Sequence, residues 1–69
     1  MNIEELEKGR NAIRREAKEV LNRIEEINKG KREAIKRGDM RSVREAEEEI
    51  KELRREFFKK HLIDPYNVH

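Results

Sequence analysis

The sequence predicts an all-α fold, an antiparallel helical hairpin in which one domain covers residues 1–69. Three observations predict it. Ala, Glu, Lys, Leu and Arg make up 40 of the 69 residues, which is typical of long helices and coiled coils. Apolar residues recur at alternating spacings of three and four in two long segments. Between those segments stand Gly38 and Asp39, a pair suited to a tight turn.

The first helix is expected over residues 3–37. Asn2 is a good N-cap residue, and Glu5 completes a capping box with it. With a heptad written from residue 3, eight of the ten a and d positions are apolar, which indicates a packed seam. These ten positions are Ile3, Leu6, Arg10, Ile13, Ala17, Val20, Ile24, Ile27, Lys31 and Ala34.

Two glycines interrupt this first segment, Gly9 and Gly30. Each costs roughly 1 kcal/mol relative to Ala inside a helix. Gly30 could divide the segment and give three helices, but the seam keeps its phase through both glycines, which favours one long helix. A glycine here could also admit a close neighbour.

The second helix is expected over residues 39–62, with Gly38 ending the first helix and Asp39 capping the second. Its seam consists of Val43, Ala46, Ile50, Leu53 and Phe57. Asp64-Pro65 is predicted to close this helix, because the residue before a proline avoids helical conformation. Residues 64–69 then form a short tail.

The two predicted helices differ in length, at about 52 Å and about 36 Å. Folded back, the second covers the first only to about residue 13 and leaves an apolar overhang beyond it. A lone hairpin also has a thin core. We therefore expect two hairpins to pair as a four-helix bundle homodimer. The alternative is that Ile63, Tyr66 and Val68 of the tail fold over the overhang. The residues expected to carry self-association are Ile3, Leu6, Ile13, Val20, Ile24, Ile27, Ile50, Leu53 and Phe57.

Charge is abundant but nearly balanced, with 18 Lys and Arg against 16 Asp and Glu. The segment 29–44, at the tip of the hairpin, is basic. Its seven cations could contact nucleic acid or an acidic partner. The competing interpretation is a solvated face held by i,i+4 pairs. No aromatic residue lies among these cations and no common nucleic-acid motif is present, so we favour the solvated face. The seven are Lys29, Lys31, Arg32, Lys36, Arg37, Arg41 and Arg44.

The acidic run and the histidines do not predict a metal site or a catalytic site. Carboxylates one or two positions apart in the run 45–49 point to different sides of a helix and cannot converge on one ion. His61, Asp64 and His69 lack the spacing of metal ligands, and His61 suits a helix end. A core this thin cannot enclose a catalytic pocket. We therefore expect no enzyme activity, no cofactor and no metal.

Phe58 stands beside the seam residue Phe57, about 100° round the helix from it. It is expected to pack under the tail, and otherwise to anchor another protein. We expect neither a membrane span nor a signal peptide, and hence a cytoplasmic protein. The lack of Thr and Gln beside much Glu, Lys, Arg and Ile is typical of proteins from hot environments. The sequence thus predicts a small non-enzymatic protein that self-associates and acts as an interaction or structural module.

Overall fold

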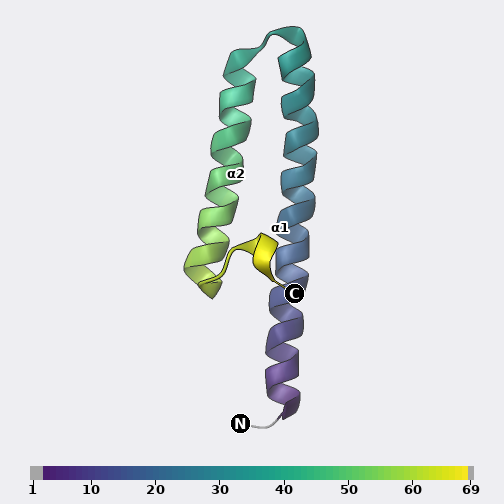
Figure 1. Cartoon of the computed structure of the whole chain (residues 1–69), viewed down its shortest axis with the longest axis vertical. Coiled ribbons are helices and arrows are strands. Elements are labelled where there is room, and N and C mark those ends of the chain that lie inside the picture. Colours follow the sequence, from purple (N-terminus) through teal and green to yellow (C-terminus); the bar gives the residue numbers. More distant parts are fainter. Residues whose placement is uncertain (1–2, 69) are drawn as a thin grey trace.

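The chain folds as an all-α helical hairpin, which confirms the predicted arrangement of two helices within one chain. The computed structural model describes residues 3–68, with side chains from residue 9 onward. It contains α1 (Ile3–Arg37), α2 (Met40–His61) and a short 3₁₀ turn, η1 (Pro65–Asn67). Figure 1 shows α1 and α2 side by side and antiparallel, with the tail crossing between them. The molecule is elongated, with extents of 54 × 18 × 12 Å.

Helix α1 is continuous through both of its glycines, so the three-helix alternative is wrong. A Cβ added at Gly9 or Gly30 would meet nothing within 4 Å. Packing within the chain therefore does not require glycine at either position. The predicted cap, Asn2 with Glu5, falls outside the residues whose side chains the structure describes.

The turn forms as predicted, through hydrogen bonds that join two helix caps. Gly38 adopts φ +72°, the left-handed conformation that favours glycine. Its N–H donates to the Ile35 carbonyl at 3.0 Å, and the Asp39 N–H donates to the Ala34 carbonyl at 2.8 Å, which is a Schellman motif. The Asp39 carboxylate then accepts from the Ser42 N–H at 3.2 Å and from the Ser42 hydroxyl at 2.6 Å. These two bonds lower the pKa of Asp39.

Helix α2 ends at His61, one residue before the predicted end, and for a different reason. Leu62 adopts the left-handed conformation with φ 56°, and its N–H donates to the Phe58 carbonyl at 2.7 Å. The prediction that Asp64-Pro65 closes α2 is therefore wrong. Asp64 instead caps η1, where its side chain accepts from the Tyr66 N–H at 3.0 Å.

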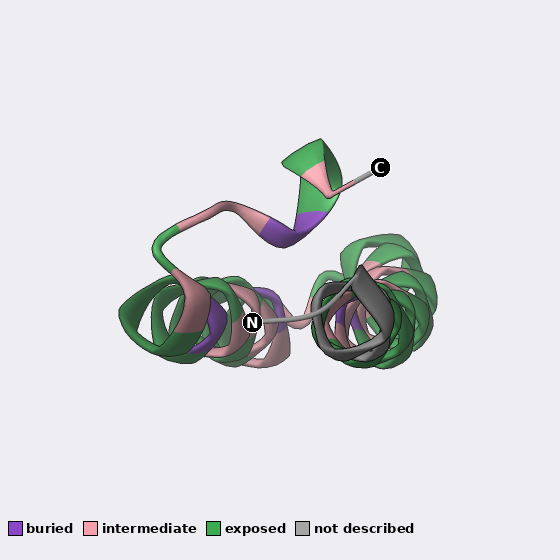
Figure 2. Cartoon of the chain, turned by 90° about the horizontal axis from the view of Figure 1, so that it is seen from below, coloured by how far each residue is buried: buried purple, intermediate pink, exposed green. Residues whose placement is uncertain are grey.

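The buried residues of α1 and α2 lie on the sides of the two helices that face each other (Figure 2). Ala34 and Val43 are buried near the turn, and the ring of Phe57 is buried toward the far end of the hairpin. Because the core is one layer deep, each helix keeps most of its circumference in solvent. The buried apolar residues of this core are Ala17, Ile24, Ala34, Val43 and Phe57.

The tail folds back over one side of the two-helix layer (Figure 2). Pro65 is buried there, and Asp64 forms an ion pair with Arg54 at 2.6 Å. The tail lies beside the paired part of α1, while α1 continues beyond both the tail and the end of α2 (Figure 1). The alternative in which the tail covers the overhang is therefore wrong. We call the side that carries the tail the tail side, and the opposite one the open side.

Candidate interaction surfaces

Helical rotation assigns residues to these two sides. Ile24 of α1 and Val43 of α2 face each other and serve as the reference positions. Because the two helices are antiparallel, residues rotated in the same direction about their own helix axis, away from these two, lie on the same side of the hairpin. At about 100° per residue, Arg54 and Phe58 are turned one way from Val43, and Leu53 is turned the other way. Arg54 binds Asp64 of the tail, so residues rotated in the direction of Arg54 and Phe58 lie on the tail side. Residues rotated in the direction of Leu53 lie on the open side.

The residues predicted to carry self-association divide into three groups. Ile24 and Phe57 are only 2% and 3% exposed, so they hold the hairpin itself together. Ile3 and Leu6 lie outside the residues whose side chains are described. The other five are half-buried in the single chain and could bury further area against a partner. They are Ile13, Val20, Ile27, Ile50 and Leu53.

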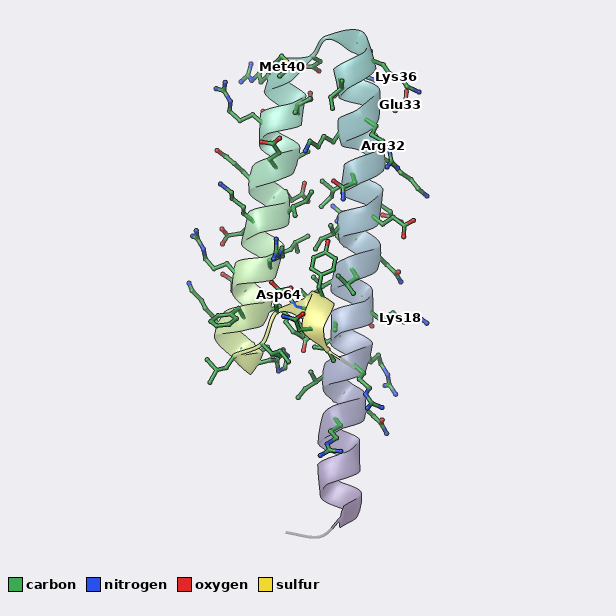
Figure 3. The ribbon with its side chains drawn as sticks, in the orientation of Figure 1. Lys18, Arg32, Glu33, Lys36, Met40 and Asp64 are labelled. Atoms are coloured by element: carbon green, nitrogen blue, oxygen red, sulfur yellow. The ribbon has the colours of Figure 1, made fainter. Side chains whose placement is uncertain are left out.

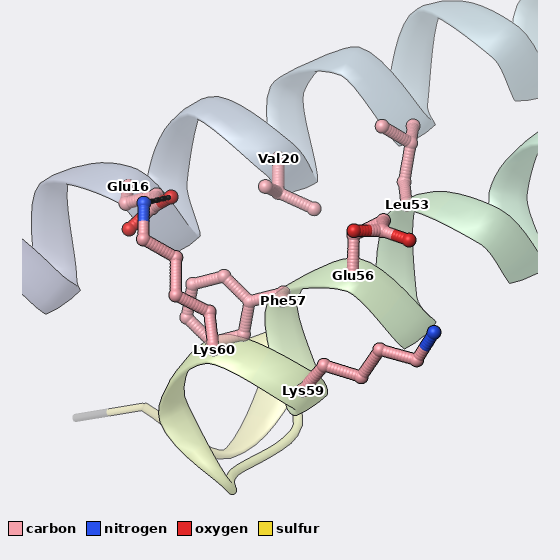
Figure 4. Close-up of a pocket in the computed structure, with 7 residues that line it drawn as sticks. All are labelled: Glu16, Val20, Leu53, Glu56, Phe57, Lys59 and Lys60. Carbon is pink, nitrogen blue, oxygen red and sulfur yellow. Dashed lines mark hydrogen bonds and ion pairs between the residues drawn. The ribbon is translucent and has the colours of Figure 1, made fainter.

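A groove of about 480 Å³ opens between the helices on the open side. Figure 4 shows Val20 and Leu53 on either side of it, from α1 and α2 respectively, with Glu16 and Lys60 paired at one end. The groove has apolar walls and a charged rim, and it is open to solvent. Such a shape suits side chains of a docking helix better than an enclosed substrate. The complete lining is Glu16, Val20, Leu53, Glu56, Phe57, Lys59 and Lys60.

Glu16 of α1 binds two residues at the end of α2, an interaction that was not predicted from the sequence. Its carboxylate accepts from Lys60 Nζ at 2.9 Å and lies 2.5 Å from His61 Nε2. The His61 ring also contacts the Phe57 ring at 4.6 Å between centroids. Hydrogen bonds from Lys60, and then from His61, lower the pKa of Glu16. Glu16 occupies a g position of the heptad, where ion pairs between helices form, so heptad position was the available signal.

At the basic tip, three of the seven predicted cations are paired with glutamates. Lys31 binds Glu47 on the opposite helix at 3.1 Å. Lys36 lies 3.8 Å from Glu33, and Arg41 lies 3.6 Å from Glu45. The other four form no ion pair within the described part of the chain, and they are Lys29, Arg32, Arg37 and Arg44.

The acidic run 45–49 complements α1 of the same chain. Glu47 binds Lys31, and Glu49 binds Arg23 at 3.2 Å across the open side. Arg41–Glu45 is an ion pair at i,i+4, whereas Glu33 pairs with Lys36 at i,i+3 and not with Arg37. Other ion pairs lie at i,i+3 within one helix or join the two helices, because facing helices offer partners that a lone helix lacks.

Phe58 does not pack under the tail as predicted, since it is 52% exposed. Leu62 beside it is 79% exposed. The tail is held instead by Arg54, which binds Asp64 and whose guanidinium carbon lies 5.3 Å from the centroid of the Tyr66 ring. The hydrogen bond from Arg54 lowers the pKa of Asp64, and the N–H of Tyr66 adds to this effect. The same contact raises the pKa of Arg54.

Within the described residues, no group of three or more His, Cys, Asp or Glu side chains is arranged to hold a metal ion. Neither α1 nor α2, as far as they are described, has the length and apolarity that a membrane crossing needs. Comparison with known proteins finds no match to a family model, to a curated protein or to a solved structure.

Proposed function

We propose that this protein is a non-enzymatic interaction module that self-associates through its open side as a four-helix bundle homodimer. The observation that carries the proposal is the asymmetry of the hairpin: the tail covers one side and leaves the other without a cover. On that open side lie Val20, Ile27 and Leu53, each half-buried by the chain alone. A second hairpin laid on them completes their burial and turns the one-layer core into a bundle core.

The area that the single chain exposes supports this proposal. Its accessible surface is 5885 Å², whereas about 4,600 Å² is typical of a compact protein of this mass. The excess, about 1,300 Å², exceeds the roughly 800 Å² per partner that a stable interface usually buries. The radius of gyration is 15.3 Å, against about 11 Å for a compact chain of this length and about 14 Å for one of twice the length. The dimensions of one chain thus suit half of a bundle.

The overhang of α1 gives a second reason for a partner. Glu16 meets the last residues of α2, so residues 3–15 of α1 extend about 20 Å further with no helix of the same chain beside them. In an antiparallel pair, the partner's helices lie along this overhang. Gly9 and Gly30 both lie on the open side by helical rotation, and neither has a neighbour within 4 Å. A missing side chain there lets a second backbone approach closely.

The test is sedimentation equilibrium between about 5 and 500 µM. The wild type is expected to sediment as two chains, and Leu53→Glu as one, because a carboxylate in the groove cannot be buried without a partner charge. The matched control is Phe58→Glu, which makes the same kind of change five residues away on the tail side and is expected to leave the dimer intact. A wild-type mass of one chain at all concentrations would refute self-association. Circular dichroism is the control that tests whether both variants remain helical.

A further inference from the structure

The charges of this nearly neutral chain are sorted between the two sides of the hairpin. On α1, a set of cations is turned by about 80–120° from Ile24 toward the tail side, and α2 carries a matching set relative to Val43. Figure 3 shows Lys18, Arg32 and Lys36 projecting from α1 away from α2. We call this set the basic face. It consists of Arg14, Lys18, Arg32, Lys36, Arg44, Lys51 and Arg55.

The acidic residues gather mainly on the open side. By the same rotation, the glutamates there outnumber the cations Arg23, Arg37 and Lys60. On the tail side, the relation is reversed: its cations outnumber its carboxylates, which are Glu25, Glu47, Glu48 and Asp64. Two of these are already engaged, Glu47 with Lys31 and Asp64 with Arg54. The glutamates of the open side are Glu16, Glu19, Glu26, Glu45, Glu49 and Glu56.

Several cations of the basic face have no partner for their charge. Within the described residues, Lys18, Arg32, Arg44 and Lys51 form no ion pair with an acidic side chain. Arg55 lies 4.0 Å from Glu52 in an exposed contact, which is worth little in water. From Lys18 to Arg32 the face extends about 21 Å along α1, with Glu25 as a carboxylate between them at a similar rotation. A row of that length fits a polymer of negative charges better than a single anion.

Aromatic rings lie among the cations at one end of the basic face. Phe58 lines a shallow concavity of about 300 Å³ together with Lys51, Arg54, Arg55 and Asp64. Tyr66 is 52% exposed, and Arg54 stacks against its ring. The absence of aromatic residues, which counted against nucleic acid at the hairpin tip, therefore does not apply to this face. Proteins that bind single-stranded nucleic acid combine two elements: cations that lie along the phosphate backbone and aromatic rings on which the bases stack.

We propose that the basic face binds single-stranded nucleic acid, with phosphates at its lysines and arginines and bases stacked on Phe58 and Tyr66. A single strand fits better than a duplex because bases inside a duplex are not free to stack on protein rings. The basic face lies opposite the open side. Binding is therefore independent of self-association, and Leu53→Glu is expected to bind as the wild type does.

The first test is fluorescence anisotropy with labelled twelve-residue oligothymidylate and oligouridylate. With about four phosphates contacted, affinity is expected to fall about 50-fold between 50 and 200 mM salt. No binding of either oligonucleotide at 50 mM salt and 100 µM protein would overturn the proposal. Equal affinity for a twelve-base-pair duplex would overturn the assignment to single strands.

The second test compares variants of equal charge. Lys51→Glu with Arg55→Glu is expected to weaken binding at least tenfold and to lower the salt slope. Arg15→Glu with Arg37→Glu changes the charge equally away from the basic face and is expected to have a much smaller effect. Equal losses in the two double variants would show attraction by net charge alone and overturn the proposal.

The third test removes a stacking ring. Phe58→Ala is expected to weaken binding about fivefold or more without changing the salt slope, because stacking releases no counterions. Unchanged affinity in Phe58→Ala would overturn the role of the ring. Thermal melts confirm that each variant is folded.

Discussion

Gly30 allows the proposed pairing to be separated from the stability of the hairpin. In the single chain a Cβ at this position meets nothing within 4 Å, and the backbone is helical. Gly30→Ala therefore gains the full difference in helix propensity, about 1 kcal/mol. For a domain of this size, that gain raises Tm by about 4–8 °C. Gly30→Lys gains somewhat less, but it places a charged chain on the open side.

The assay is thermal unfolding by circular dichroism at about 5 and 200 µM, with sedimentation equilibrium at both concentrations. Gly30→Lys is expected to raise Tm at the concentration where single chains dominate, and to raise the dissociation constant of the dimer at least tenfold. Most substitutions that stabilise a helix also stabilise an assembly of helices. A higher Tm of the single chain together with weaker dimerisation is therefore specific to a partner that lies at Gly30. An unchanged dissociation constant in Gly30→Lys would refute the placement of a second chain there. A lower Tm in Gly30→Ala would refute the open surroundings of the position.

Two further predictions concern the caps and ion pairs. Asp39→Ala removes both bonds to Ser42 and is expected to destabilise the hairpin by about 1 kcal/mol, lowering Tm by about 4–8 °C, whereas Asp39→Asn retains most of the cap. The pKa of Glu16 is lowered in the folded chain, so its contribution to stability is present above its ordinary value of 4.5 and is lost as pH falls through the folded value. Acidification is therefore expected to lower Tm less in Glu16→Gln than in the wild type, and parallel curves of Tm against pH would contradict this role.

Features set by neighbouring residues were predictable from the sequence. Gly38 and Asp39 encode the turn locally, since one supplies the left-handed residue and the other the cap. The core seam followed from spacing alone, as Ile24 and Phe57 show.

Features that depend on how the elements meet were not predictable in the same way. The contact of Glu16 with His61 joins residues 45 positions apart and depends on the register of the two helices. Leu62 adopts a left-handed conformation that is unfavourable for a leucine, so no local preference indicates it. The tail's position rests on Arg54, one of many arginines, which nothing in the sequence distinguishes. The sorting of charge between the two sides was available from helical rotation, but only once the tail had distinguished those sides.

The position of the tail also limits how far assembly can proceed. A hairpin with two bare sides could add a further hairpin on each, and such stacking has no natural end. With the tail on one side, each chain offers only its open side to the proposed pairing, which across a two-fold axis would use that side of both chains and stop at two. The same arrangement turns both basic faces outward, on opposite surfaces of the pair. In the proposed dimer, the few residues after α2 would thus favour a closed complex over an open fibre and give it two equivalent outer faces.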